Sequence, residues 1–152
     1  MEPTKAPYTN FTTRNIDGQP EVFDPIRRRW VALTPEEEVR QQTILHLHNH
    51  YNYPLELMQV EGAITLNGMT RRCDIVVYRD GRPILIVECK RPDVPITQKV
   101  CDQACRYNTV LQVPFLLLTN SIQTVIVHVD LINRQLRQLS DLPPWAELNV
   151  KK

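Results

Sequence analysis

The chain has 152 residues, of which 42% are hydrophobic and 23% charged, and its net charge is +1. This balance is typical of one globular domain with its own core. Because the net charge is close to zero, any binding of nucleic acid must depend on local basic patches. No apolar run approaches the ~18 residues needed to span a membrane, and the N-terminus lacks a signal-peptide pattern. We therefore expect a cytoplasmic protein without a membrane segment.

Residues 1–30 are rich in Pro, Thr, Asn and Arg and end in the basic stretch IRRRW. They predict an N-terminal arm, either extended or folded as a pair of short strands. We expect the folded domain to cover residues 31–145 and a short tail to follow at 146–152.

Two helices and five strands are predicted beyond the arm. Thr34 can cap a first helix, Pro35 suits its first turn, and Glu37 completes a capping box. Asn52 and Pro54 end that helix. The later elements, in chain order, are a strand at 57–66, a hairpin within 71–91, a helix within 93–112, and strands within 113–120 and 124–130.

The strand sequences DIVVY, PILIVE and PFLLL are apolar on both faces, which is typical of a sheet covered on both sides. The helix between the second and third of these is long enough for a crossover to a parallel strand. The chain therefore predicts an α/β fold with three layers, α/β/α, around a central mixed sheet with an αβββαβ core.

Two groups of metal-binding residue types have simpler explanations. The four cysteines, at 73, 89, 101 and 105, form no C-x-x-C pair, so buried free thiols are favoured over a metal or disulfide site. His46 and His50 are one helical turn apart and could bind a metal. Without a third ligand at suitable spacing, surface histidines are the favoured interpretation.

Charged residues bracket the apolar hairpin: Asp74 begins one strand, and Glu88 and Lys90 end the other. Glu88 and Lys90 point to the same face because they are two apart on a strand. If Asp74 lies opposite Glu88, two carboxylates meet beside an ammonium group, an arrangement suited to Mg²⁺ and to phosphodiester hydrolysis. The alternative is an exposed ion pair at the end of a strand.

The register of the hairpin tests this idea. A plain two-residue turn at Asp80 and Gly81 would pair Arg79 with Arg82, and so Asp74 with Val87. Glu88 would then point to the wrong side. The site therefore requires a longer loop or a β-bulge that shifts the register by one residue.

From about Asp24 to Trp145 the sequence resembles the PD-(D/E)xK, or restriction-endonuclease-like, nuclease superfamily. The resemblance is strongest to the N-terminal nuclease domain of type I restriction enzyme R subunits, through RRCDIVVY, LIVECKRPD and QACRYN. The proline that names the superfamily is replaced by Cys73.

The resemblance implies that Asp74, Glu88 and the backbone carbonyl of Cys89 bind Mg²⁺, with Mn²⁺ as a substitute, while Lys90 assists the attacking water. It implies that Glu37, or next Glu38, completes the metal shell, although a capping role alone would also explain Glu37. A Q-x-x-x-Y motif matches Gln103 and Tyr107, on one helix face, where they would support the substrate. Core packing of Tyr107 and solvation of Gln103 are the alternatives.

Basic residues near these positions predict contacts to a DNA backbone. They are Arg71, Arg72, Arg79, Arg82, Arg91, Lys99 and Arg106. An ordinary solvated surface is the alternative for each of them.

We therefore predict a Mg²⁺-dependent deoxyribonuclease with little sequence specificity. The alternative is a DNA-binding or assembly module that cleaves only with a helicase, translocase or specificity partner. Pairing as a homodimer and binding of RNA or repair intermediates stay open.

Overall fold

The computed structural model describes residues 11–148, which fold around a six-stranded mixed sheet with the order β4-β5-β6-β7-β8-β9. Its strands are β4 (Met58–Leu66), β5 (Met69–Arg79), β6 (Arg82–Cys89), β7 (Phe115–Thr119), β8 (Thr124–Asp130) and β9 (Gln135–Leu139). Strands β6 and β7 are parallel and every other neighbouring pair is antiparallel. Helix α2 (Gln98–Leu111) makes the crossover between β6 and β7, as predicted.

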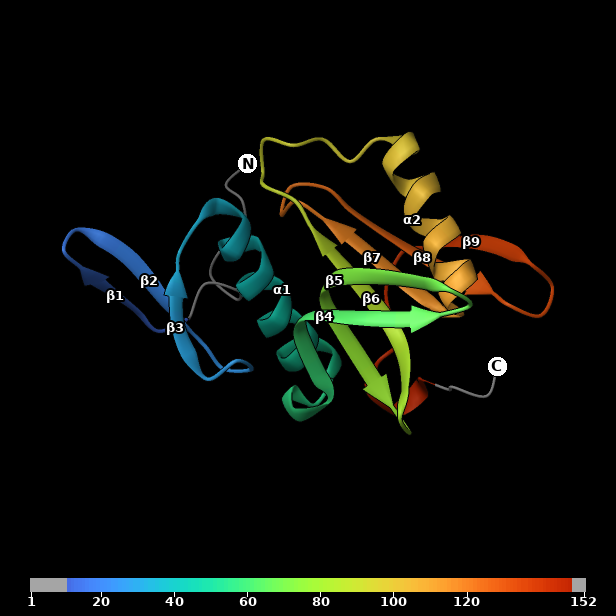
Figure 1. Cartoon of the computed structure of the whole chain (residues 1–152), viewed down its shortest axis with the longest axis horizontal. Coiled ribbons are helices and arrows are strands. Elements are labelled where there is room, and N and C mark those ends of the chain that lie inside the picture. Colours follow the sequence, from blue (N-terminus) through green and yellow to red (C-terminus); the bar gives the residue numbers. More distant parts are fainter. Residues whose placement is uncertain (1–10, 149–152) are drawn as a thin grey trace.

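Two helices cover opposite faces of this sheet (Figure 1). Helix α1 (Pro35–Tyr51) packs through Ile44 and Leu47 on a core that includes Val87. Helix α2 packs through Leu111 on a second core that includes Ile86, the neighbour of Val87 on β6. Because adjacent strand residues point to opposite faces, these two cores confirm the predicted three-layer α/β/α fold.

Both helices begin at a threonine. Thr34 caps α1 by accepting a hydrogen bond from the backbone N–H of Glu37 (3.1 Å), and Thr97 caps α2 by accepting from the N–H of Val100 (3.2 Å). Asn52 ends α1 in the left-handed conformation. The Glu37 carboxylate makes its hydrogen bonds to other side chains, described below. The predicted cap at Thr34 is confirmed, but the reciprocal half of the capping box is not, because among the described residues the Glu37 carboxylate accepts no hydrogen bond from the N–H of Thr34.

The N-terminal arm contains one strand more than predicted. Strands β1 (Thr13–Ile16), β2 (Gln19–Asp24) and β3 (Arg29–Ala32) form a separate antiparallel sheet. Figure 1 shows this sheet on the far side of α1 from the main sheet. The predicted domain boundary at residue 30 falls inside β3, and residues 1–10 lie outside the described part of the chain.

The end of the chain also differs from the prediction. Strand β9 follows β8 and was missed, and short 3₁₀ helices occur at Leu55–Leu57 and Trp145–Glu147. Leu148, placed in the tail by the sequence analysis, is buried in the core beside α1. The remaining tail residues, 149–152, lie outside the described residues. Across residues 11–148, no helix has the length and apolar character needed to cross a membrane.

The β5–β6 hairpin contains the register shift that the sequence required. Its turn is the short one, since Arg79 pairs with Arg82 around Asp80 and Gly81, both at positive φ. The register then slips at Ile84, so that Val77 pairs with Leu85 and Ile75 with Val87. One more step along this register places Asp74 opposite Glu88. The predicted β-bulge is therefore confirmed.

The neighbouring β4–β5 hairpin changes face along its length. Val60 and Ile75 belong to the core under α1, whereas Ile64 and Cys73 belong to the core under α2. The change occurs at Glu61, whose φ is 56°, and at Asp74 on the adjoining strand. Asp74 therefore lies where β5 changes the face that its side chains present, between Cys73 on one face of the sheet and Ile75 on the other.

Candidate active site

The carboxylate of Asp74 is fixed at the end of the β5–β6 hairpin by two donors. Its Oδ2 accepts a hydrogen bond from the backbone N–H of Cys89 (2.7 Å). Its Oδ1 accepts from Nη2 of Arg40, on α1 (2.9 Å). The bond to Cys89 brings Asp74 to the peptide that follows Glu88, so the motif residues of the two strands meet in space.

Glu88 has a different arginine partner. It forms an ion pair with Nη2 of Arg71, whose guanidinium carbon lies 4.2 Å from the centre of the Tyr107 ring. Gln103 donates to the hydroxyl of Tyr107 (3.3 Å), one helical turn away on α2. The predicted neighbours Gln103 and Tyr107 thus contact each other and brace the arginine that binds Glu88.

Lys90 follows directly after β6. Its backbone N–H donates to the carbonyl of Thr119 on β7 (2.9 Å), which holds the chain at the carboxyl ends of the two parallel strands. The residue is half-buried, and within residues 11–148 its ammonium group makes no ion pair. A charged lysine at this position is available to hold a water molecule or a phosphate oxygen.

Glu37 does not lie directly against Asp74. Its Oε1 accepts from Arg40 (2.7 Å), and its Oε2 accepts from Arg27 (2.8 Å) and Gln41 (3.0 Å). Arg40 therefore bridges Glu37 and Asp74. Within the described residues, no three His, Cys, Asp or Glu side chains come together as a metal-binding group. The expected shell of Asp74, Glu88 and Glu37 around one ion is not assembled.

The donor chemistry nevertheless suits Mg²⁺. This ion keeps several water ligands and is usually held by only one or two carboxylates. Asp74 and Glu88 supply two, with side chains 24% and 14% exposed, so both reach solvent. Each is held by a guanidinium group that a cation would have to displace. The residues therefore fit the ion with Asp74 and Glu88 as ligands, and the roles of Glu37, Glu38 and the Cys89 carbonyl stay predictions.

Three charged residues near this site were missed by the sequence analysis: Asp24 and Arg40, which are buried, and Arg27, which is half-buried. Asp24 is fully buried and accepts from Arg27 Nε (2.6 Å). Burial alone would lower the pKa of Arg27, but its hydrogen bonds to Glu37 and Asp24 raise it. Burial likewise opposes the charge of Arg40, and its bonds with Asp74 and the nearby Glu37 raise its pKa. Both arginines therefore stay charged. The spacing of Arg40 to Glu37, three residues on one helix, was the available signal.

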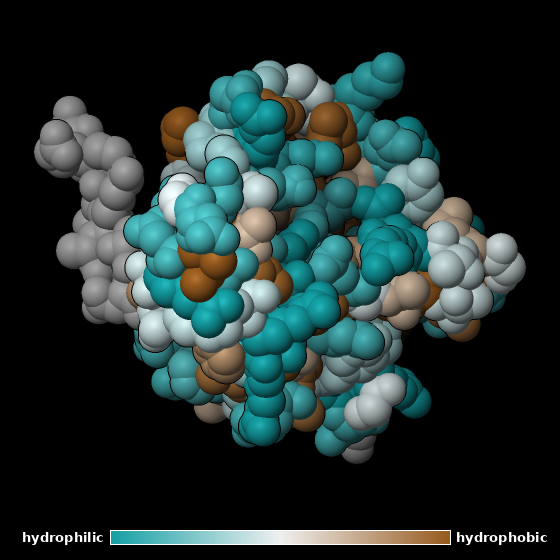
Figure 2. Space-filling view, turned by 60° about the vertical axis from the view of Figure 1, so that its left-hand side comes forward, coloured by the Kyte–Doolittle hydropathy of each residue, from teal (hydrophilic) through white to brown (hydrophobic). Residues whose placement is uncertain are grey.

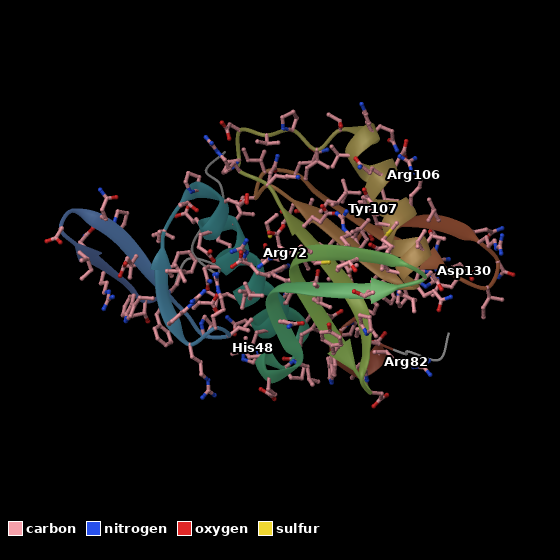
Figure 3. All side chains as sticks on the ribbon, in the orientation of Figure 1. His48, Arg72, Arg82, Arg106, Tyr107 and Asp130 are labelled. Atoms are coloured by element: carbon pink, nitrogen blue, oxygen red, sulfur yellow. The ribbon has the colours of Figure 1, made fainter. Side chains whose placement is uncertain are left out.

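The predicted basic strip is not continuous. Arg79 and Arg82 lie at the turn, roughly 17 Å along the strands from Asp74, and Figure 3 shows Arg82 well away from Arg72 and Tyr107. Arg79 donates to the carbonyl of Trp145 (2.5 Å) and lies over its ring. Arg79 thus contacts the C-terminal segment and is not placed to bind a substrate at Asp74.

Of the other basic positions, Arg72 and Arg91 are close in sequence to Asp74 and Lys90, whereas Lys99 and Arg106 lie on α2. Arg72, Lys99 and Arg106 are exposed, and Arg91 pairs with exposed Asp93 (3.1 Å). Figure 2 shows a mostly hydrophilic face on the side of α1 and the N-terminal sheet, with its hydrophobic residues scattered. DNA binding by the exposed residues stays a prediction.

The cysteines match the interpretation drawn from the sequence, whereas His46 is half-buried and is therefore not an ordinary surface histidine. All four cysteines are free; Cys73, Cys89 and Cys105 are buried, and Cys101 is half-buried. Burial raises the pKa of the Cys73 thiol to about 11, so the protonated form is favoured. His46 stacks on His50 with ring centres 4.9 Å apart.

The fold and the hairpin site define a restriction-endonuclease-like α/β domain. Residues 35–143 match the family described as the type I restriction enzyme R protein N terminus, and the chain belongs to this family. No curated protein matches the chain.

The solved structures that resemble this chain include two that differ in origin. The first is a fragment assigned as the HsdR subunit of a type I restriction enzyme from Vibrio vulnificus YJ016, with a TM-score of 0.50 and 22% identity over 74% of this chain. This chain spans only 24% of that one, and the likeness shows the fold. The second, a DUF820 protein from Anabaena variabilis ATCC 29413 assigned as a nuclease, has a TM-score of 0.49 and 12% identity, and covers 89% of this chain and 80% of its own.

Proposed function

We propose that this chain is a Mg²⁺-dependent DNA nuclease. The observation that carries the proposal is the bulged hairpin, which joins Asp74 to the peptide between Glu88 and Cys89 and leaves the Lys90 ammonium group unpaired among the described residues. The family to which the chain belongs supports the same chemistry.

In this proposal Asp74 and Glu88 bind the metal, and Lys90 acts on the attacking water. Asp74 and Glu88 would hold the ion, which supplies polarisation of a phosphate oxygen and a lower pKa for bound water. Lys90 would orient the attacking water and offset charge on the phosphate. The water gives up a proton as its oxygen forms a bond to phosphorus. The bond from phosphorus to the 3′ oxygen breaks, and that oxygen takes up a proton. The products would be a 5′-phosphate and a 3′-hydroxyl.

The second candidate is a module that cleaves DNA only as part of a larger assembly. One observation favours it: the chain spans about a quarter of the Vibrio fragment it resembles, so the likeness is to one domain of a larger chain. A helicase, translocase or specificity subunit would then supply DNA and release the site for cleavage. The hairpin site and its metal would be the same.

The test is nicking of supercoiled plasmid by purified protein in Mg²⁺ or Mn²⁺, with EDTA as a control. Asp74→Asn and Lys90→Ala should each reduce the rate by about two orders of magnitude or more. Asp80→Asn is the matched control, because Asp80 lies at the exposed far turn, and it should cleave like the wild type. Cleavage that survives Lys90→Ala would refute the assigned site. A folded protein that cleaves no plasmid, single-stranded or branched DNA would favour the assembly module.

A further inference from the structure

A buried chain of alternating charges leads from the N-terminal sheet to the candidate metal centre. Asp24 binds Arg27 (2.6 Å), Arg27 binds Glu37 (2.8 Å), Glu37 binds Arg40 (2.7 Å), and Arg40 binds Asp74 (2.9 Å). The side chains of the first four residues are 14% exposed or less. Ion pairs in such surroundings are weakly screened by solvent, so they hold a fixed geometry.

The carboxylate of Glu37 is already occupied. Arg40 bonds to one oxygen, while Arg27 and Gln41 bond to the other. To ligate a cation at Asp74, Glu37 would have to release at least one buried guanidinium group. That arginine, Arg27 or Arg40, would lose one of its carboxylate partners at a site with little solvent, which is unfavourable. The geometry therefore favours Glu37 as an anchor for arginines over Glu37 as a metal ligand.

Arg40 forms two ion pairs and keeps one donor without a hydrogen-bond partner among the described residues. Its Nη1 is bound to Glu37 and its Nη2 to Asp74. Its Nε is buried and has no hydrogen-bond partner among the described residues. Nε and Nη2 lie along one edge of the guanidinium plane, and that edge can bind two oxygens of a phosphate. Arg40 thus has a free donor beside the carboxylate at which the reacting phosphate would lie.

We propose that α1 reaches the catalytic centre through Arg40, which binds a phosphate of the substrate, and that Asp24, Arg27 and Glu37 are the residues that position it. The inference rests on the proposed function, because it takes DNA phosphate as the ligand. It also gives the N-terminal sheet a part in the site, although Asp24 and Arg27 lie before the family match at residues 35–143.

A measurement of metal binding distinguishes Glu37 as a metal ligand from Glu37 as an anchor for arginines. Mn²⁺ affinity of the full chain is measured by titration with detection of free Mn²⁺, without DNA. Asp74→Asn should weaken it about tenfold or more, since a ligand is lost, whereas Glu37→Gln should change it by less than about threefold. Arg40→Met should strengthen Mn²⁺ binding, because a cation that competes for Asp74 is removed.

DNA binding tests the role of Arg40. The affinity for a short fluorescent duplex is measured in Ca²⁺, with folding of each variant checked by circular dichroism. Arg40→Met should weaken binding about tenfold, and Arg40→Lys should restore only part, because lysine lacks the planar fork. Arg29→Met, an exposed arginine on β3, is the matched control and should bind like the wild type. If Glu37→Gln does not fold, Arg27→Met/Glu37→Gln removes one charge of each sign and takes its place.

The outcomes are distinct. A loss of Mn²⁺ affinity in Glu37→Gln equal to that in Asp74→Asn would make Glu37 a ligand and overturn this inference alone. Duplex binding by Arg40→Met that equals binding by Arg29→Met would overturn it as well. Unchanged Mn²⁺ affinity in Asp74→Asn would remove the metal centre itself, and the proposed function with it.

Discussion

Arg27→Met should destabilise the protein far more than an ordinary surface arginine would. The side chain is 14% exposed and contacts Asp24, which is fully buried, Glu37, and the more exposed Glu61 (2.8 Å). Removing one partner of a buried ion pair costs about 3–5 kcal/mol. Glu37 keeps Arg40 and Gln41, so Asp24 is the carboxylate left without a countercharge. Asp24 still accepts two backbone N–H bonds, which favours the lower end of the range, about 3 kcal/mol.

Urea unfolding followed by circular dichroism measures this free energy. A loss of that size corresponds to a fall in Tm of roughly 6–12 °C for a chain of this length. Arg14→Met is the matched control in the same sheet, because its exposed pair with Glu21 and its contact with the Trp30 ring should together contribute no more than about 1 kcal/mol. Equal losses in Arg27→Met and Arg14→Met would refute the view that the N-terminal sheet is tied to α1 by buried charges.

Three further outcomes follow from particular contacts. Burial opposes ionisation of Asp24, but hydrogen bonds from the backbone N–H groups of Arg27 and Ile26 and from the Arg27 side chain lower its pKa below 3.8. The ionised Asp24 therefore stabilises the fold above pH 3.8, and this contribution is lost as the pH falls through its folded pKa. In Asp24→Asn, the free energy of unfolding should fall less steeply at acid pH than in the wild type. The same dependence on pH in both proteins would contradict this. Tyr107→Ala should lower the free energy of unfolding in urea by about 1 kcal/mol, because it removes the contact with Arg71. Tyr107→Phe keeps the ring and should lower it by less than half as much. Equal losses would exclude the ring contact. Gly81→Val should lower the free energy of unfolding by about 1–2 kcal/mol because φ is +76°, and Gly81→Asn should lower it much less. An unchanged stability of Gly81→Val would show that the turn can relax.

The main sheet could be predicted because its strands are apolar on both faces and bounded by turn residues. The crossover through α2 followed from the length between β6 and β7. Strand β9 was missed because QLRQL is polar and mostly exposed, so it pairs with β8 without an apolar face to mark it. The third N-terminal strand, β3, was missed because it is short and starts in a run of arginines.

The site was only partly visible in the sequence. Asp74, Glu88 and Lys90 could be named because charged residues at the ends of apolar strands require an explanation. The need for a register shift was also predictable, but its position at Ile84 was not, since uniformly apolar strands carry no alternation that fixes register. The partners of Arg40 and Arg27 include residues 34 positions away, Asp74 and Glu61, and no local spacing predicts such pairs.

Asp74 and Glu88, the two carboxylates proposed to bind the metal, are each held by an arginine. Arg40 on Asp74 and Arg71 on Glu88 neutralise both side chains in the absence of an ion. A divalent cation alone must displace guanidinium groups and leave them without a countercharge, which opposes binding. A cation that arrives with a phosphate offers those guanidinium groups a new anion. Metal and DNA should therefore each raise the affinity for the other, by the same factor. Such coupling would keep the site inactive until both are present.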